Sequence, residues 1–267
     1  MTILAPATVE MTRSLYANVR GRRRAVVEAT QAGVAAGADL IHQGLAPAAC
    51  GRWSVTFCDG QLLQPGDVLV EIEGEAFELG VAEDFVLGPL GFASGVATRA
   101  RAFREAAPQG LSIACGGWKK LPAPLKPALR AGLAAAGLLP RLVAGDFVYL
   151  SKNAVRLLGG VAEAIAAGRA LQHGPVALQV QSAGEALSAA RLGAGVIMVD
   201  TGALTDLVET HAALSAAGLR EEVTLAFGGG VTLELLQPAF AAGAQTVDVG
   251  RAILDAPLLD LRMRVLE

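Results

Sequence analysis

From Gly110 onward, short apolar segments alternate regularly with longer segments rich in Ala and Leu. The short segments have the length and composition of buried strands, expected at 111–115, 146–150, 176–180, 196–199, 223–227 and 246–249. Segments between them, such as NAVRLLGGVAEAIAAG (153–168), have the length of helices. Strands and helices that alternate in this way form right-handed parallel βαβ units. This half of the chain therefore predicts an incomplete barrel or a doubly wound sheet.

The chain before Gly110 follows a mixed pattern. A helix is expected over 26–43, strands over 52–57 and 68–79 with a Pro-Gly-Asp turn between them, and a helix from Val81 to about Ala106. The last helix carries small residues, which allow another backbone to approach closely. These small residues are Gly91, Ser94, Gly95 and Ala97.

Composition narrows the function classes. Hydrophobic residues make up 53% of the 267 residues but aromatic residues only 4%, which suits helices packed closely on parallel strands. A net charge of −3 argues against general attraction to nucleic acid or to an anionic membrane. We expect no signal peptide and no run of about 20 residues that spans a bilayer. Cys50, Cys58 and Cys115 are too scattered for a disulfide framework or a zinc site, and reduced thiols in a cytoplasmic protein are expected.

Two glycine-containing turns predict a phosphate site. In AFGGGVT (226–232) a strand ends before Gly228, Gly229 and Gly230, and in VDVGRAI (247–253) Gly250 and Arg251 follow the last strand. Backbone N–H groups in such turns point at anions, and barrel enzymes commonly bind phosphate at their last two strands. The alternative is that these glycines only make tight turns between strands and helices.

Polar residues at other strand ends are candidates for chemistry. Asp200 follows a buried strand and Gln179 sits one strand earlier, whereas the alternative for Asp200 is a helix N-cap. Lys119, Lys120 and Lys126 make a basic loop suited to pyrophosphate, unless they are solvated surface lysines. Arg141 precedes the next strand and is a second candidate for anionic oxygens.

Other catalytic classes lack their motifs. The histidines have no metal-ligand spacing, and there is no Gly-x-Ser-x-Gly elbow, P-loop or dinucleotide-binding G-x-G-x-x-G. Covalent acyl chemistry and nucleotide hydrolysis are therefore not expected.

Several motifs, in order along the chain, resemble those of the quinolinate phosphoribosyltransferase family. DGQLLQPGDVLVEIEGEA (59–76) resembles D-G-x-x-V-x-x-G-D-x-L-x-x-I-x-G, and EDFVLGPLGFASGVATRARAF (83–103) resembles E-R-T-A-L-N followed by S-G-I-A-T. IMVDTGAL, FGGGVT and VDVGRAI resemble I-x-L-D-N, A-S-G-G-I-T and S-V-G-A-L.

The resemblance implies an α/β fold in two domains. Residues 1–106 would form an N-terminal α/β open-faced sandwich with a linking helix, and residues 107–267 an incomplete parallel β/α barrel of about six strands. It also implies a homodimer in which one subunit covers the other's barrel mouth. The family transfers a pyridine dicarboxylate onto phosphoribosyl pyrophosphate, with Mg²⁺, and releases pyrophosphate and carbon dioxide.

The resemblance assigns roles unevenly. The expected catalytic residues are Lys119, Asp200 and Gln179, with Asp200 also the metal ligand. The expected phosphate-binding residues are Gly228, Gly229, Gly230, Gly250 and Arg251. The expected substrate-binding residues are Arg141, Trp118, Asp84, Lys152 and Ser151. Departures from the family pattern are Trp118 for Arg, Pro140 for His, Ser151 for Lys with Lys152 adjacent, Gln179 for Glu, and Asp84 for the Arg after Glu83.

These departures mostly remove cationic groups expected to hold two carboxylates. The chain is therefore expected to be a divergent paralogue with a less anionic acceptor, in a family that includes a member encoded in molybdenum-transport operons. Alternatives are an authentic quinolinate phosphoribosyltransferase, a non-catalytic phosphosugar-binding paralogue, and another barrel enzyme that shares only the phosphate site.

Overall fold

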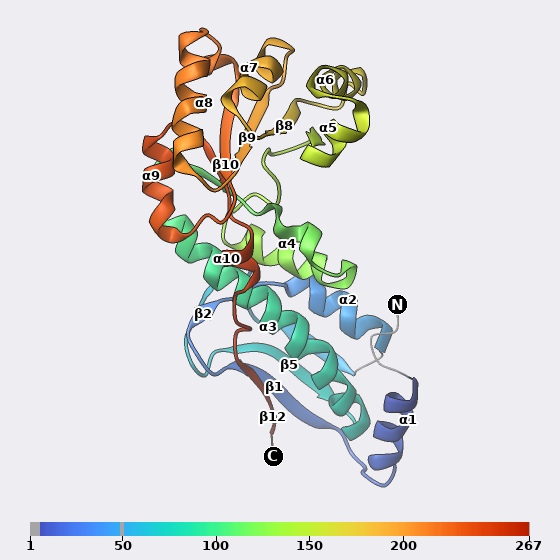
Figure 1. Ribbon diagram of the computed structural model, residues 1–267. Helices are drawn as coiled ribbons and strands as arrows, with labels where there is room; N and C mark the ends of the chain where they lie inside the picture. Colours follow the sequence, from blue (N-terminus) through green and yellow to red (C-terminus); the bar gives the residue numbers. More distant parts are fainter. Residues whose placement is uncertain (1–5, 49–50, 267) are drawn as a thin grey trace. The chain divides into compact units, whose positions relative to one another are not determined.

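The computed structural model describes residues 6–48 and 51–266, which divide into two compact units (Figure 1). The first unit contains the described residues up to Arg101, together with 121–137 and the chain from Ala256 onward. The second contains 102–120 and 138–255. Each unit thus takes its residues from separate parts of the sequence.

The first unit is built on an antiparallel sheet with the strand order β12-β1-β5-β3. Its strands are β1 (Arg23–Ala29), β3 (Arg52–Val55), β5 (Val68–Gly74) and β12 (Leu261–Leu266). Beside it lie the short pair β2 (Gly33–Val34) and β4 (Leu62–Leu63), and the helices α1 (Pro6–Leu15), α2 (Ala38–Ala48), η2 (Ala123–Leu125) and α4 (Lys126–Ala135). Apolar side chains of the sheet pack against the first half of the long helix α3 (Ala76–Ala106). Figure 1 shows this helix lying along the sheet.

The helix predicted over 26–43 is wrong in its first part, because Arg23–Ala29 forms the central strand β1. Val26 and Val27 are β-branched and fit a strand well. The decisive contacts come from distant parts of the sequence, because β1 pairs with both β5 and β12. Local periodicity does not report such pairing. Only α2, from Ala38, is helical within that run as described.

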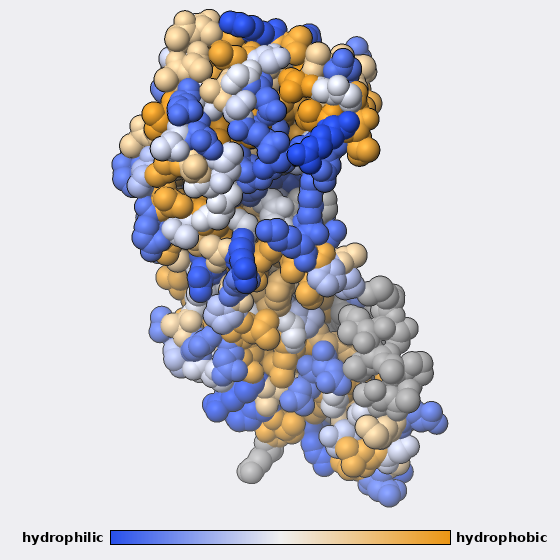
Figure 2. All heavy atoms as spheres, viewed as in Figure 1, coloured by the Kyte–Doolittle hydropathy of each residue, from blue (hydrophilic) through white to orange (hydrophobic). Residues whose placement is uncertain are grey.

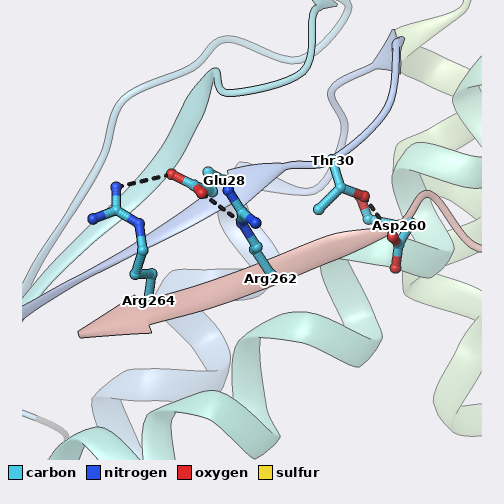
Figure 3. Close-up of polar contacts among 5 residues, drawn as sticks. All are labelled: Glu28, Thr30, Asp260, Arg262 and Arg264. Atoms are coloured by element: carbon cyan, nitrogen blue, oxygen red, sulfur yellow. Dashed lines mark hydrogen bonds and ion pairs between the residues drawn. The ribbon is translucent and has the colours of Figure 1, made fainter. Parts of the chain in front are cut away.

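An ion-pair cluster joins β1 to the C-terminal strand (Figure 3). Glu28, whose side chain is 5% exposed, accepts hydrogen bonds from Arg262 at 2.6 Å and from Arg264 at 3.2 Å. These two arginines, Arg264 first, hold the pKa of Glu28 below its usual range. Nearby, Thr30 Oγ1 donates to the carboxylate of Asp260 at 2.5 Å. The polar contacts therefore fix the register of a strand that returns from the far end of the chain.

Helix α3 begins earlier than the predicted Val81, and the strand predicted over 68–79 ends at Gly74. The backbone N–H of Glu75 donates to Glu78 Oε2 at 2.7 Å, which satisfies an N–H group at the start of the helix. The predicted close approach is confirmed: a Cβ on Gly91 would lie 3.0 Å from the Leu259 carbonyl oxygen, and one on Gly95 would collide with the Pro257 carbonyl.

By length and composition alone, α3 is long and apolar enough to cross a membrane. The sequence analysis expected no such segment. In the structure 56% of the relevant window is buried, and Val86, Leu90, Ala93 and Val96 are fully covered. Much of its apolar surface is therefore used in the protein core.

The second unit holds a parallel six-stranded sheet with the order β6-β11-β10-β9-β8-β7. Its strands are β6 (Ser112–Ala114), β7 (Val148–Leu150), β8 (Val176–Val180), β9 (Val196–Asp200), β10 (Thr224–Gly228) and β11 (Thr246–Asp248), which confirms each predicted strand. Its helices are η1 (Gly116–Lys120), α5 (Lys152–Leu158), α6 (Val161–Ala170), α7 (Ala183–Arg191), α8 (Leu204–Ala216), η3 (Arg220–Glu222), η4 (Leu233–Leu235), α9 (Leu236–Ala241) and α10 (Arg251–Leu254).

The strand order decides between the two architectures that the sequence left open. A doubly wound sheet reverses direction at an internal switch point. Here β7 to β11 follow one another in order, and the first strand, β6, pairs with the last, β11. Among the described residues β6 and β7 do not pair with each other, so the barrel is incomplete, as predicted. The carboxyl ends of all six strands meet at one edge.

The thiols are free where the structure describes them: Cys58 is exposed and Cys115 is buried. Cys50 lies outside the described residues. Leu157 of α5 is 87% exposed. Figure 2 shows hydrophobic surface beside hydrophilic surface over α5 and α6.

Candidate active site

A cavity of about 490 Å³ lies at the carboxyl ends of the parallel strands, entirely within the second unit. Its polar lining comes from the ends of these strands and from the turns and loops that follow them. The lining residues are Gly116, Gly117, Lys119, Lys120, Arg141, Leu142, Phe147, Tyr149, Ser151, Gln179, Asp200, Gly229, Gly230, Asp248, Gly250 and Arg251. Ligands of parallel α/β proteins bind at this edge of the sheet.

The turn after β10 has a backbone that only glycine adopts easily. Gly229 and Gly230 have φ values of +99° and +91°. A Cβ on Gly229 would lie 2.9 Å from the Thr201 carbonyl carbon and would collide with the N–H of Gly202. Gly250 follows at the end of the neighbouring strand β11 and also lines the cavity. Two glycine turns on adjacent strands thus face one space, the arrangement expected for a phosphate.

Replacing Gly229 by Val is expected to weaken binding of inorganic phosphate by about tenfold or more, because the turn must move and its N–H groups no longer point at the phosphate. Calorimetric titration measures the affinity. Gly218→Val is the matched control: Gly218 also has a positive φ, of +71°, with nothing near its Cβ position, and does not line the cavity. Unchanged affinity in Gly229→Val would exclude this phosphate site.

The carboxylates of Asp200 and Asp248 flank Gly228. Gly228 of β10 is in register with Asp200 of β9 on one side and with Asp248 of β11 on the other. A Cβ on Gly228 would lie 3.2 Å from Asp200 Oδ1 and 3.4 Å from Asp248 Cβ. Gly228 itself is buried beneath the cavity. A Cβ there would also collide with Met198 Cε, so the absence of a side chain leaves room for the Met198 methyl group between the two strands.

A hydrogen-bond network fixes Asp200. The amide of Gln179 donates to Asp200 Oδ2, and Gln179 Oε1 accepts the backbone N–H of Lys152 at 3.1 Å. Because that N–H can only donate, the Gln179 side chain must turn its NH₂ group toward Asp200. The Lys152 ammonium donates to the Asp200 backbone carbonyl at 3.1 Å. Gln179 and Lys152 thus hold the end of β9 in place.

The turn after β6, residues 116–120, carries two lysines and is called the lysine turn below. Lys119 and Lys120 are exposed and line the cavity. The Lys119 ammonium lies 4.7 Å from the ring centre of Tyr149. Across the same cavity, the Arg141 guanidinium stacks 4.2 Å from the ring centre of Phe147. Aromatic faces attract cations, so both charges are held near the cavity wall.

Burial changes the acidity of several groups beside the cavity. It raises the pKa of Asp248, with Asp200 adding to the rise, while the Gly116 N–H and then Lys120 and Lys119 oppose it. Burial, followed by the charges of Asp200 and Asp248, raises the pKa of Tyr149 to about 12. Burial also raises the pKa of Cys115 to about 11, so this thiol is a poor nucleophile.

Most of the residues predicted from the sequence line this one cavity. They are Lys119, Asp200, Gln179, Gly229, Gly230, Gly250, Arg251, Arg141 and Ser151. Ser151 also caps α5, since its Oγ accepts the N–H of Ala154. Lys152 lies behind the cavity lining, and Asp84 is an exposed residue of α3 in the other unit. The side chain of Trp118 lies outside the described residues. Lys126, named with the basic loop, belongs to α4 of the first unit.

Among the polar side chains that line the cavity, the sequence analysis missed Asp248 and Tyr149. Asp248 ends the last strand just before Gly250, which is the position that Asp200 holds on β9. The same rule that selected Asp200 therefore applies to Asp248. No such rule selects Tyr149, because a tyrosine inside a buried strand is predicted to be a core residue.

Models of one protein family match both parts of the chain. "Quinolinate phosphoribosyl transferase, C-terminal domain" matches residues 96–264, and "Quinolinate phosphoribosyl transferase, N-terminal domain" matches residues 10–94.

Individual relatives carry related names. A probable nicotinate-nucleotide pyrophosphorylase (carboxylating) of Bacillus subtilis is 30% identical over 252 residues, 90% of this chain and 83% of the relative. The rat nicotinate-nucleotide pyrophosphorylase (carboxylating) is 28% identical over 91% of this chain and 81% of its own. The crystal structure of the nicotinate-nucleotide pyrophosphorylase of Ehrlichia chaffeensis has a TM-score of 0.80 and 14% identity, and the two chains cover each other fully, at 100%. The similarity to this crystal structure supports the assignment of the fold.

Proposed function

The chain belongs to the quinolinate phosphoribosyl transferase family, and from this premise we propose that it transfers phosphoribosyl from phosphoribosyl pyrophosphate to a small nitrogen heterocycle. The acceptor in this proposal is less anionic than quinolinate.

One observation carries the proposal: two elements suited to binding anions line the same cavity. The glycine turns at Gly229, Gly230 and Gly250 fit a sugar 5′-phosphate, and the lysine turn offers Lys119 and Lys120 to a second anionic group. Carboxylates line the space as well, at Asp200 and Asp248. A sugar that carries a phosphate at one end and a pyrophosphate at the other matches this distribution of charge.

The residues divide the work of the reaction between them. The bond from ribose C1 to the pyrophosphate oxygen breaks, and a bond from the acceptor nitrogen to C1 forms. Lys119 stabilises the negative charge that develops on the departing pyrophosphate. Asp200, held by Gln179, accepts hydrogen bonds from ribose hydroxyls and stabilises the positive charge that develops near C1. A ring nitrogen with a free lone pair attacks directly, so its attack requires no protein base.

The donor set fits a magnesium ion that arrives with the substrate. Among the described residues there is no cluster of three or more His, Cys, Asp or Glu side chains of the kind that holds a metal alone. Mg²⁺ commonly binds one or two carboxylates and completes its shell with substrate phosphates and water. Asp200 is the carboxylate that would hold it. When bound, the ion neutralises charge on the pyrophosphate.

Quinolinate itself is the second candidate acceptor, favoured by the names of the relatives described above. The cavity gives reason to prefer a less anionic ring. Two carboxylates, Asp200 and Asp248, already line it, and Lys119 and Lys120 are engaged by the pyrophosphate in the proposed reaction.

The experiment is an assay of pyrophosphate release with phosphoribosyl pyrophosphate, Mg²⁺ and a panel of nitrogen heterocycles that includes quinolinate. Release that depends on one neutral or singly charged heterocycle supports the proposal. Release with quinolinate alone supports the second candidate. Tight donor binding without release for any acceptor would favour a non-catalytic phosphosugar-binding protein.

We further propose that the protein is a cytoplasmic homodimer. The exposed hydrophobic surface over α5 and α6, including Leu157, is the kind of surface that self-association covers. Light scattering at micromolar concentration is expected to give the mass of a dimer. A stable monomer would contradict this proposal and leave the phosphate site untouched.

A further inference from the structure

Asp248 makes a contact that the proposed chemistry does not use. Its Oδ1 accepts the backbone N–H of Gly116 at 2.5 Å. Asp248 ends β11, and its register partner on the neighbouring strand β6 is Ala114. The hydrogen bond therefore joins the end of β11 to the first residue of the lysine turn.

The lysine turn is packed on the residues that follow Asp248. A Cβ on Gly116 would lie 2.6 Å from Asp248 Oδ2. A Cβ on Gly117 would lie 2.7 Å from Leu254 Cδ1 and 3.4 Å from the Gly250 Cα. Both glycines thus allow the turn to sit directly against the β11 turn, which carries Gly250. The lysine turn, proposed to bind the pyrophosphate, is therefore in contact with the turn proposed to bind the 5′-phosphate.

The charges of Lys120 and Lys119 favour the ionised form of Asp248, but a carboxylate here is unfavourable toward the anionic groups of the donor. Asp248 lines a cavity proposed to receive a phosphate and a pyrophosphate, and like charges repel one another. Its burial disfavours the charged form further, as the raised pKa shows. The hydrogen bond to Gly116 is the feature of Asp248 that would benefit anion binding, since it fixes the turn that presents Lys119 and Lys120.

We propose that Asp248 is a positioning residue for the donor: by accepting the Gly116 N–H, it holds the lysine turn where Lys119 and Lys120 meet the pyrophosphate group. This inference rests on the proposed function. It concerns how the leaving group is held and adds a residue that the family resemblance did not mark.

Two substitutions at position 248 separate positioning from charge. Asp248→Asn removes the negative charge but keeps an oxygen that accepts the Gly116 N–H. Asp248→Ala removes both. A simple charge effect predicts tighter pyrophosphate binding in both variants, because both lose a repulsive carboxylate. If Asp248 acts by positioning, Asp248→Asn should keep pyrophosphate binding, whereas Asp248→Ala should weaken it.

The experiment titrates inorganic pyrophosphate with Mg²⁺ into the full-length protein by calorimetry. Asp248→Ala is expected to bind about tenfold more weakly than wild type, the cost of a lost charge-assisted hydrogen bond, and Asp248→Asn at least as tightly as wild type. Gly116→Ala tests the same contact from the other side, because its Cβ displaces the carboxylate. Asp146→Ala is the control, since Asp146 is an exposed carboxylate of the same unit and does not itself line the cavity. Thermal unfolding confirms that each variant is folded.

If Asp248→Ala fails to fold, Gly116→Ala and Asp248→Asn decide the question. Wild-type affinity in Gly116→Ala, or weak binding in Asp248→Asn, would overturn the inference while the proposed function stands. Failure of the wild-type protein to bind either pyrophosphate or phosphoribosyl pyrophosphate would overturn both.

Discussion

Replacing Lys119 or Asp200 by Ala is expected to lower turnover by about 100-fold or more while the protein stays folded, as when a preorganised electrostatic group is removed from an active site. Lys119 would act on charge that develops on the leaving pyrophosphate. Asp200 would act on the ribose side of the breaking bond. Both effects fall on the transition state, so kcat and kcat/KM should fall by the same factor while KM changes little.

The structure explains why stability should change little. Lys119 is exposed, and its ammonium lies over the face of Tyr149. Asp200 is half-buried, and its removal leaves the Gln179 amide beside a cavity that admits water. Because water can take the place of the carboxylate, that change should cost only about 1 kcal/mol of the free energy of unfolding.

The measurement is steady-state pyrophosphate release with the acceptor found in the panel assay, together with thermal unfolding of each variant. Arg191→Ala and Asp146→Ala are the matched controls, because both residues are exposed in the second unit and neither lines the cavity. Wild-type rates in Lys119→Ala and Asp200→Ala would remove these residues from the mechanism.

Quinolinate is expected to be a poor substrate, with a kcat/KM two to four orders of magnitude below that of the preferred acceptor. Quinolinate carries two carboxylates on adjacent ring carbons, and a site that selects it must supply several fixed cations. Losing two charge-assisted contacts costs about 3–6 kcal/mol, which is about two to four orders of magnitude in rate.

The described cavity supplies cations mainly where the donor needs them. Lys119 and Lys120 lie on the lysine turn, and Arg251 follows the Gly250 turn. Arg141 remains for the acceptor. The same cavity also contains Asp248, a partly buried carboxylate, which disfavours an anionic acceptor.

The resemblance points in the same direction at sites that the cavity does not include. Pro140 and Asp84 stand where the family has His and Arg, so two polar groups that usually face the acceptor are missing or reversed in charge. A neutral ring avoids the cost of placing a dianion near such groups.

Competition kinetics test this prediction directly. Quinolinate is compared with the preferred acceptor at equal concentrations, and formation of nicotinate mononucleotide is followed with time. Quinolinate turnover at about 1 s⁻¹ or faster, an ordinary enzyme rate, would restore the activity named for the relatives and refute the divergent acceptor.

The sequence by itself determined the parallel sheet of the second unit. Its strands are buried on both faces and read as continuous apolar runs, so their positions follow from local composition. The glycine turns could also be predicted from the sequence, because Gly229 and Gly230 need positive φ values that few other residues adopt. Asp200 was found because carboxylates at the ends of parallel strands project toward the binding edge.

Only the tertiary structure decided which residues meet. Arg23–Ala29 became a strand because β5 and β12 pair with it from distant positions, and no local period records such partners. Asp248 became part of the site because β6, the first strand, lies beside β11, the last, which brings Gly116 within hydrogen-bonding distance. Residues 121–137 and the chain from Ala256 onward pack with the first unit although they lie far along the sequence. Hydrophobic patterning reports whether a segment is buried, whereas the identity of its neighbour depends on the path of the whole chain.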